Sequence, residues 1–321
     1  MLSFNTNNGA ILALDVLRST TGNRDDTLSR VSSGQRVATA ADNAAYWSIA
    51  TTMRSDNKML SAVEDALGLA GGIVDSATNG YSAATDVLVE FKKLLVLSRE
   101  AGVDRDKVNT DLDQLKDQLK NIANSSSFAE QNWLKRTDVT DDADRQMVGS
   151  FRRDADGGVT VTNITYEIAG TAGTSDVNFL VDDLSGDSGI LTGSGFAAEL
   201  GTSKDWVLFN GENGGAYDEI TLTDTTTGAE IEEMISVVDA MAERTIEVAT
   251  ALGAIGTRIE LQSEFTRDLQ DSIEFGVGKM VDADLNAEST RLRALQTQEQ
   301  LGIQALQIAN SGTERFLDLL L

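Results

Sequence analysis

The sequence predicts a mainly α-helical protein: a long antiparallel helical bundle or coiled coil built from both chain ends, with a small β-containing insert in the middle. Three observations predict this fold class. Apolar residues recur at alternating steps of three and four towards both ends of the chain. The 321 residues include no proline, the residue that most strongly breaks a helix interior. The middle instead shows short β-branched runs separated by Asp, Asn, Gly and Ser.

The longest apolar repeat lies in the C-terminal half of the chain. Its members are Val238, Met241, Thr245, Val248, Leu252, Ile255, Ile259, Gln262, Thr266, Leu269 and Ile273. A second repeat, nearer the N-terminus, consists of Val108, Leu112, Leu115, Leu119 and Ile122. Each stripe needs a partner helix to cover it, so we expect the two ends to meet in space and to carry the intervening segment as an insertion.

In the first 124 residues these patterns predict three helices and a linker. Residues 1–34 should form a helix after a frayed start, and because its apolar stripe is thin in the middle it needs a partner. Residues 42–54 should form a compact linker with helical character. A helix over about 56–101, ending at Gly102, and a third helix over 104–124 should follow.

The insert is expected over residues 138–228. Residues 159–168 should form a strand region, and the Asn210-Gly211 pair between 206–209 and 220–222 suggests hairpin-like turns. Helix should resume near Ala229, continue to about Gly276, and return after Gly278 before the apolar end at residues 316–321.

Composition removes most enzyme mechanisms. The chain has no histidine and no cysteine, so it lacks the side chains for Ser-His-Asp or Cys-His catalysis, for the usual zinc sites and for disulfide bonds. We therefore expect no catalytic residue, no bound metal and no cofactor.

The charge of the chain limits its possible partners. With 51 acidic and 26 basic side chains, the net charge is −25, which argues against nucleic acid as a partner. Residues 137–232 hold 19 acidic and four basic residues, as expected of a solvated outer surface, whereas the nearly neutral ends can pack against one another.

No stretch approaches the roughly 20 apolar residues that span a bilayer. The start lacks the features of a cleavable secretory signal, so any export should use another route.

Three acidic or glycine-rich patterns in the insert could be binding or catalytic sites. Residues 193–198 match a relaxed GxGxxA dinucleotide fingerprint, but the required βαβ setting is missing and a flexible loop is favoured. The Asp182-Asp183 pair could be imagined as an acid/base couple of a glycosidase, yet such pairs are abundant in a chain this acidic. Calcium ligation is the third pattern, and solvated loop acids are favoured over it because neither acidic run has the full ligand spacing. The two runs are Asp154, Asp156 and Gly157, and Asp138, Asp141, Asp142 and Asp144.

Several ordered blocks at the two ends resemble the bacterial flagellins. At the start they are residues 3–7, residues 28–37 with Arg30, Ser32, Ser33 and Gly34, residues 40–45 with Asp42 and Asn43, and residues 53–55 with Arg54. Towards the end they are residues 252–258 with Arg258, residues 281–288 with Asp282 and Asp284, and residues 304–310. The resemblance covers roughly 135 residues at the start and about 90 at the end, and it rests on many blocks in the same order rather than on one short motif.

This resemblance implies a structural subunit that polymerises helically into the flagellar filament used for swimming motility. It implies that residues 1–45 and 280–321 pair as the inner tube, that residues 46–136 and 233–279 form a helical shell, and that residues 137–232 face solvent. It also implies a secreted, extracellular protein, exported unfolded through the flagellar type III apparatus. The implied partners are copies of itself or related flagellins, an export chaperone, the filament cap and hook-junction proteins.

The residue pattern suggests how such assembly works. Helices with apolar stripes at both ends cannot bury themselves within one subunit, so their folding should be coupled to polymerisation. The residues expected to make the inner contacts are Leu14, Leu17, Leu28, Val31, Leu292, Leu295, Leu306 and Phe316. An intramolecular core role for the same residues is the alternative. Two other functions stay open: a hook-associated or junction protein with the same terminal architecture, and a secreted glycan-active or calcium-binding protein that uses the insert.

Overall fold

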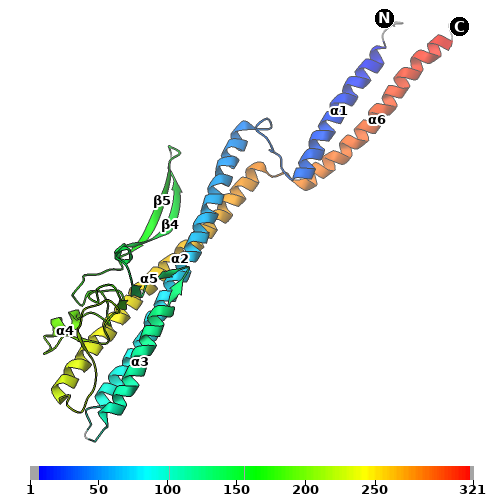
Figure 1. The fold of residues 1–321 in the computed structure, drawn as a ribbon. Coiled ribbons are helices and arrows are strands. Elements are labelled where there is room, and N and C mark those ends of the chain that lie inside the picture. Colours follow the sequence, from blue (N-terminus) through cyan, green and yellow to red (C-terminus); the bar gives the residue numbers. More distant parts are fainter. Residues whose placement is uncertain (1–6, 101, 155, 319–321) are drawn as a thin grey trace. The chain divides into compact units, whose positions relative to one another are not determined.

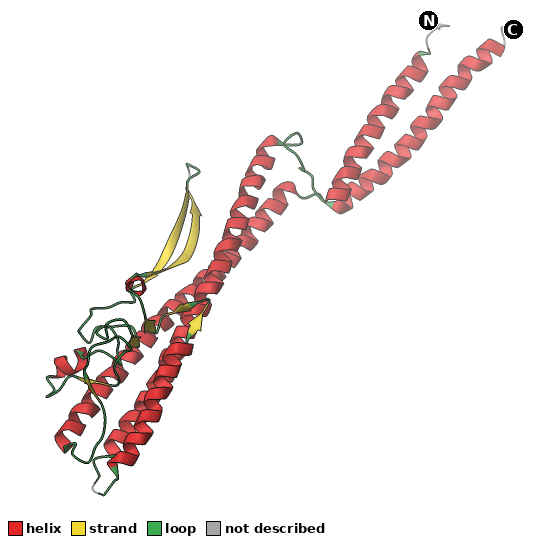
Figure 2. Cartoon of the chain, in the orientation of Figure 1, coloured by secondary structure: helices red, strands yellow, loops and turns green. Residues whose placement is uncertain are grey.

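The computed structural model describes residues 7–100, 102–154 and 156–318, with side chains as far as residue 311. Most of these residues are helical, and the strands are short and confined to the middle of the chain (Figure 2). The predicted fold class, mainly α with a small β-containing insert, is therefore confirmed. The chain forms two compact units, residues 59–268 and residues 1–58 with 269–321.

The larger unit is built on three helices that share one apolar core. They are α2 (Ala44–Leu97), α3 (Arg105–Ser125) and α5 (Gly228–Val281), of which α2 and α5 also extend into the smaller unit. Core residues include Tyr81, Phe91, Leu112, Met241 and Leu252, all at most 1% exposed. Every member of the two predicted apolar repeats is buried or half-buried, because the period of the stripe matches that of the helix.

Helix ends are fixed by side-chain caps. The carboxylate of Asp104 accepts from the backbone N–H of Lys107 at the start of α3. Thr227 and Glu230 form a reciprocal capping box at the start of α5, in which each side chain accepts from the other residue's backbone N–H. The helical character predicted for residues 42–54 is confirmed, but they form no separate linker and the predicted start near 56 is wrong, because Asn43 caps α2 and the helix begins at Ala44. Likewise α5 continues past Gly276 to Val281.

The insert contains paired strands and short helices. Strand β4 (Arg145–Arg153) pairs antiparallel with β5 (Val159–Tyr166), with a register shift between Val148 and Ser150. The shorter strands in the insert are β6 (Val181–Asp182), β7 (Trp206–Val207) and β8 (Asp218–Glu219), and three more directly precede it: β1 (Ser127–Phe128), β2 (Gln131–Asn132) and β3 (Lys135–Arg136). A 3-10 helix η1 (Val139–Asp142) and a helix α4 (Gly195–Leu200) complete it.

One strand pairing differs from expectation. The segments around Trp206 and Ile220 were expected to form an antiparallel hairpin, but β7 and β8 pair in parallel, as do β3 and β6. The hairpin prediction is wrong because the chain between β7 and β8 doubles back: Asn210 accepts from the backbone N–H of Tyr217 and donates to the carboxylate of Glu219. That loop is closed by side chains, not by a two-residue turn.

The smaller unit is a pair of helices with a corner. Helix α1 (Asn8–Ser33) and α6 (Leu285–Asp318) lie side by side and antiparallel (Figure 1). Asn7 caps α1 by accepting from the N–H of Ala10, and its side-chain amide donates to the carbonyl of Ala309 across the pair. A small apolar cluster of Val37, Ala50, Val277 and Val281 lies where these helices meet the ends of α2 and α5.

Candidate assembly site

The seam between α1 and α6 follows one heptad on each helix. On α1 this heptad consists of Ala10, Ala13, Leu17, Thr20, Arg24, Thr27 and Val31, all buried or half-buried. On α6 it consists of Glu288, Leu292, Leu295, Glu299, Gly302, Leu306 and Ala309, all buried or half-buried as well. Both series alternate in steps of three and four, as two helices require when they pack along their length. Most seam residues are small or polar, so the pair buries little apolar surface.

The residues expected to make assembly contacts are distributed on both sides of this seam. Leu295 is buried, while Leu17, Val31, Leu292 and Leu306 are half-buried within the seam. Leu14 is half-buried beside the seam, and Leu28 is 50% exposed outside it. The side chain of Phe316 lies outside the described residues.

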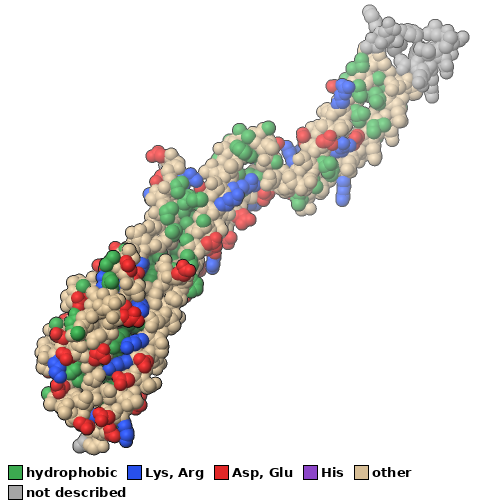
Figure 3. Space-filling view, viewed as in Figure 1, with side chains coloured by type: hydrophobic (Ala, Val, Ile, Leu, Met, Phe, Trp, Pro, Cys, Tyr) green, Lys and Arg blue, Asp and Glu red, His purple; other side chains and the backbone are tan. Residues whose placement is uncertain are grey.

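Several large apolar side chains on this helix pair remain uncovered, and of these only Leu28 was predicted from the sequence as an assembly contact. We call them the outer apolar residues; they are Ile11, Leu12, Val16, Leu285, Leu301, Ile303 and Ile308, together with Leu28. Figure 3 shows hydrophobic side chains exposed along the pair. Leu12 and Val16 are four residues apart, and Leu301 and Ile308 are seven apart, so each pair shares a helix face. This spacing is the signal that could have identified them in the sequence.

The corner consists of residues 34–43, between α1 and α2, and residues 282–284, between α5 and α6. The backbone N–H groups of Arg36 and Val37 both donate to the carbonyl of Val281, at 2.7 and 3.2 Å. The N–H of Ala283 donates to the carbonyl of Gly34 at 2.9 Å. These bonds tie the two turns together, so the direction in which α1 leaves is linked to that in which α6 begins.

Five of the ten residues named for the flagellin resemblance lie at this corner: Gly34, Asp42, Asn43, Asp282 and Asp284. Gly34 ends α1 in the left-handed conformation with φ of 70°, which favours glycine. Asp42 accepts from the backbone N–H groups of Ala38 and Thr39. The bond from Thr39 is the main reason that the pKa of Asp42 is lowered.

The remaining motif residues have more varied surroundings. Asp284 accepts from the N–H groups of Asn286 and Ala287 and so caps α6, while the backbone of Asp282 forms a bridge with Gln35. Arg30 lies 3.7 Å from Glu288 across the seam. Ser32 is exposed, and Ser33 accepts from the N–H of Gln35. Arg54 and Arg258 are exposed and form no ion pair among the described residues.

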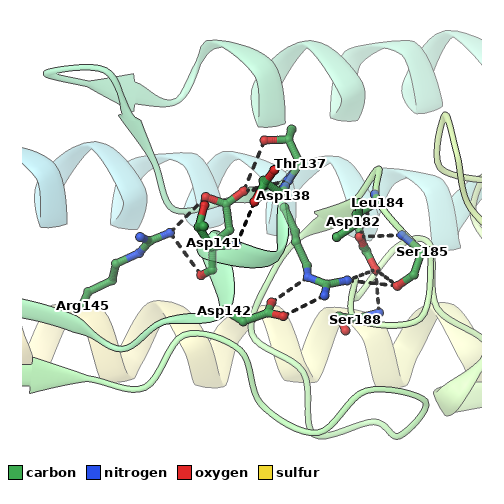
Figure 4. A network of polar contacts seen from close by, with 11 residues as sticks. Thr137, Asp138, Asp141, Asp142, Arg145, Asp182, Leu184, Ser185 and Ser188 are labelled. Atoms are coloured by element: carbon green, nitrogen blue, oxygen red, sulfur yellow. Dashed lines mark hydrogen bonds and ion pairs between the residues drawn. The ribbon is translucent and has the colours of Figure 1, made fainter.

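The paired carboxylates of the insert are structural. Asp182 is fully buried and accepts from Arg136 at 3.1 Å, and Asp183 pairs with Lys135 at 2.5 Å. Burial by itself would raise the pKa of Asp182, but the N–H of Ser188 and the hydroxyl of Ser185 hold it below its usual value (Figure 4). A carboxylate committed to so many donors is a poor general acid, so the geometry gives no support to a glycosidase site.

In the acidic run at residues 138–144, Asp138 and Asp144 are exposed as expected, whereas Asp141 and Asp142 are half-buried, and three of the four acids are engaged in local structure. Asp138 and Asp141 form a capping box around η1, and Asp142 makes two bonds to the guanidinium of Arg136, at 2.6 and 2.7 Å (Figure 4). Hydrogen bonding to Asp142 is the main cause that raises the pKa of Arg136. Among the described residues, no group of three acidic side chains is arranged to hold a metal ion.

The glycine-rich pattern at residues 193–198 leads into the short helix α4 and is packed, not flexible as expected. Phe196 and Ala197 are buried, and a Cβ on Gly195 would come within 2.2 Å of the carbonyl oxygen of Thr174. Gly195 is therefore required by the close approach of another backbone segment. No βαβ unit surrounds it in the described chain, so the arrangement gives no support to a dinucleotide site.

Comparison with known protein families identifies the family of this chain. Residues 4–138 match the bacterial flagellin N-terminal helical region, and residues 235–320 match the bacterial flagellin C-terminal helical region. The chain belongs to the flagellin family. The N-terminal match spans α1, α2 and α3, and the C-terminal match spans nearly all of α5 with α6.

Curated flagellins align over almost the whole chain. Flagellin C of Rhizobium meliloti (strain 1021) is 46% identical over 99% of both chains. Flagellin A of Rhizobium meliloti is 38% identical over 99% of this chain and all of its own, and a flagellin of Brucella melitensis biotype 1 is 36% identical over 99% of both.

This flagellin is therefore a structural subunit of the extracellular flagellar filament that serves motility, and not an enzyme. The matches support the filament subunit, and nothing in them favours a hook-associated protein. Among the described helices, none combines the length and apolar character needed to cross a membrane.

Proposed function

We propose that the α1–α6 pair is the part through which this flagellin polymerises, and that its outer apolar residues are buried by neighbouring copies. In this proposal residues 1–45 and 280–321 form the inner tube, residues 46–136 and 233–279 form the surrounding shell, and the insert at 137–232 faces solvent. Leu12 and Ile308, 68% and 72% exposed, carry the proposal because side chains of this size gain free energy when a neighbour covers them.

Charge supports the outward position of the insert. Residues 137–232 hold 19 acidic and four basic residues, a density that would repel neighbouring copies in a close-packed interior. Figure 3 shows acidic side chains spread over the insert and the helices it covers. A head-to-tail array that does not close on itself forms a helical filament, which accommodates such a surface on its outside.

The small apolar area buried between α1 and α6 supports the proposal that these helices become ordered on assembly. Within the described part of the smaller unit, the buried side chains of the helix pair are Thr20, Thr27 and Leu295, which is little apolar surface to hold two long helices together. Contacts with neighbours would add the missing stabilisation. Amide hydrogen exchange of α1 and α6 should therefore slow by at least about a hundredfold on going from dilute subunit to filament, since ordering adds several kcal/mol of protection.

Substitution of the outer apolar residues tests the assembly role. Leu12→Gln and Ile308→Gln should each slow elongation onto filament seeds by at least about tenfold, as expected for the loss of roughly 1.4 kcal/mol or more of contact energy. Val139→Gln is the matched control, because Val139 is 67% exposed but lies in the insert. Elongation at the unsubstituted rate by both helix variants would contradict the proposal.

Export through the flagellar type III apparatus, with an export chaperone, and contacts with the filament cap and hook-junction proteins are part of the same proposal. The absence of cysteine supports it, since no disulfide can prevent the chain from passing through a channel unfolded. Secretion into the medium should stop in cells that lack the export apparatus. Continued secretion there would contradict this route while leaving the filament role intact.

A further inference from the structure

Two oppositely charged side chains face each other in the middle of the α1–α6 seam. Arg24 occupies a heptad position of α1, four residues after Thr20 and three before Thr27. Glu299 occupies a heptad position of α6, between Leu295 and Gly302. Charged residues are uncommon at such positions, where they reduce stability and specify how the helices pair.

The geometry of the pair is tight. Nη1 of Arg24 donates to both carboxylate oxygens of Glu299, at 2.7 and 2.6 Å. Nε and Nη2 of Arg24 donate to Asp25 at 3.1 and 2.7 Å, which fixes the orientation of the guanidinium plane. The two side chains of the cross-helix pair are 30% and 22% exposed, so the contact is partly withdrawn from water.

Little else in the seam sets the register. Leu17 packs against Gly302, but the positions nearer the charged pair, Thr20 and Thr27, offer no large side chain that fits only one hole in the facing helix. Thr20 instead donates its hydroxyl to the carbonyl of Val16 in its own helix. A slip of one heptad would place Leu17 beside Ala309, which is also small, so packing alone discriminates weakly against a slip in that direction.

The charges of Arg24 and Glu299 strongly disfavour such a slip. A slip of one heptad would place Arg24 beside Leu292 or Leu306, and Glu299 beside Leu17 or Val31, leaving Glu299 without Arg24 and leaving Arg24 with Asp25 of its own helix as its remaining carboxylate. The second cross-helix pair has the same polarity, with Arg30 on α1 and Glu288 on α6. Pairing of α1 with another α1, or of α6 with another α6, would therefore bring like charges into the seam.

We propose that Arg24 and Glu299 are positioning residues that fix the register and the partner choice of the terminal helix pair, so that each subunit presents its outer apolar residues at the correct height in the filament. This inference rests on the proposed assembly role of the α1–α6 pair. It adds to that role a device that distinguishes the correct helix partner from the many identical helices brought close together during polymerisation.

Charge exchange tests the proposal. Arg24→Glu and Glu299→Arg should each slow elongation onto filament seeds by at least tenfold, and the double exchange should bring the rate back to within about threefold of the unsubstituted chain. Arg18→Glu is the matched control: the same change on the same helix, at an exposed position outside the seam, should leave elongation within about twofold. Thermal unfolding of the larger unit should be unchanged in all four variants.

Register can be read directly with an engineered disulfide, because the chain has no cysteine of its own. A Cβ on Gly302 would lie 3.8 Å from the Cβ of Leu17, which is the spacing of a disulfide. Leu17→Cys with Gly302→Cys should therefore cross-link within one chain in filaments. Leu17→Cys with Ala309→Cys, one heptad away, should cross-link little. Adding Arg24→Glu should reduce the in-register product or shift it to cross-links between chains, and adding Glu299→Arg as well should restore it.

The outcomes separate this inference from the assembly role on which it rests. If the unsubstituted chain does not elongate seeds, the assembly role fails. If it elongates, and the single charge variants elongate equally fast with the same in-register cross-link, the positioning role is overturned. It is also overturned if the double exchange is no better than the single changes.

Discussion

The phenolic hydroxyl of Tyr81, in α2, donates to the backbone carbonyl of Asn178 in the insert at 2.5 Å. The same hydroxyl lies 3.3 Å from the carbonyl of Trp133. On the facing helix, Arg244 of α5 donates to the carbonyl of Val177 at 3.0 Å and to the side chain of Asn178 at 2.8 Å. Two of the three helices of the larger unit thus hold one segment of the insert, and the insert is part of that unit rather than an appendage.

Removing this hydroxyl should weaken the larger unit. Tyr81→Phe leaves the carbonyl of Asn178 without its donor at a partly buried site, which should lower the free energy of unfolding by about 1–2 kcal/mol. Urea unfolding followed by tryptophan fluorescence measures the change, since Trp133 lies in the same core. Thr85→Val is the control, because Thr85 bonds only within its own helix, to the carbonyl of Tyr81. An equal or larger loss for Thr85→Val would contradict the special role of the Tyr81 bond.

Alkaline stability should depend on Tyr166, which stacks on Trp133 with ring centroids 5.7 Å apart. Burial raises the pKa of Tyr166 to about 12, although the charge of Arg244 lowers it slightly. Because the folded-state pKa lies above the unfolded value of about 10, stability is fully present below pH 10 and is lost as the pH rises towards 12. The loss from this residue should reach roughly 2 kcal/mol at the upper end. Tyr166→Phe should remove that part of the pH dependence; an unchanged pH profile in this variant would rule out Tyr166 as its source.

The Arg136 network should be far more sensitive to loss of charge than an exposed ion pair. Asp182→Asn leaves the guanidinium of Arg136, only 10% exposed, with Asp142 as its remaining carboxylate partner, and should cost about 2–4 kcal/mol. Asp154→Asn breaks the exposed pair with Arg152 and should cost under about 0.5 kcal/mol. Thermal unfolding of the two variants under the same conditions gives the comparison. Similar losses in both would show that burial does not control the energetics of this network.

How much of the structure follows from the sequence depends on the range of the interactions. The α5 repeat from Val238 to Ile273 was predictable because a stripe every 3.5 residues has one way to be buried on a helix. The parallel pairing of β7 with β8 was not, because local patterns do not say which strands meet. Asn43 is a strong helix-capping residue, yet the run of small residues after it obscured the start of α2.

The face of α1 that packs against α6 was also not predictable from the sequence. Ranking by hydrophobicity selects the face with Leu14 and Leu28, whereas the structure turns the adjacent face, with Thr20 and Thr27, towards α6. Threonine is small enough to let two helices approach closely, and leucines left outside a two-helix pair remain available for other contacts. A single sequence cannot distinguish an apolar face that packs within the subunit from one that is left for a neighbour.

The final prediction concerns Gly34, whose left-handed conformation ends α1 and places its carbonyl to accept from the N–H of Ala283. Gly34→Ala should cost about 1–2 kcal/mol, because a β-carbon disfavours this conformation. Gly34→Asn should cost less, since asparagine tolerates it. Gly22→Ala, in the interior of α1 with open space around its Cα, should instead favour the helix by about 0.5–1 kcal/mol. The midpoint temperature of filament disassembly should therefore fall for Gly34→Ala, fall less for Gly34→Asn and not fall for Gly22→Ala. If alanine and asparagine at position 34 behave alike, backbone conformation is not what this corner requires of the residue, and its lack of a side chain must matter through contact with a neighbouring subunit.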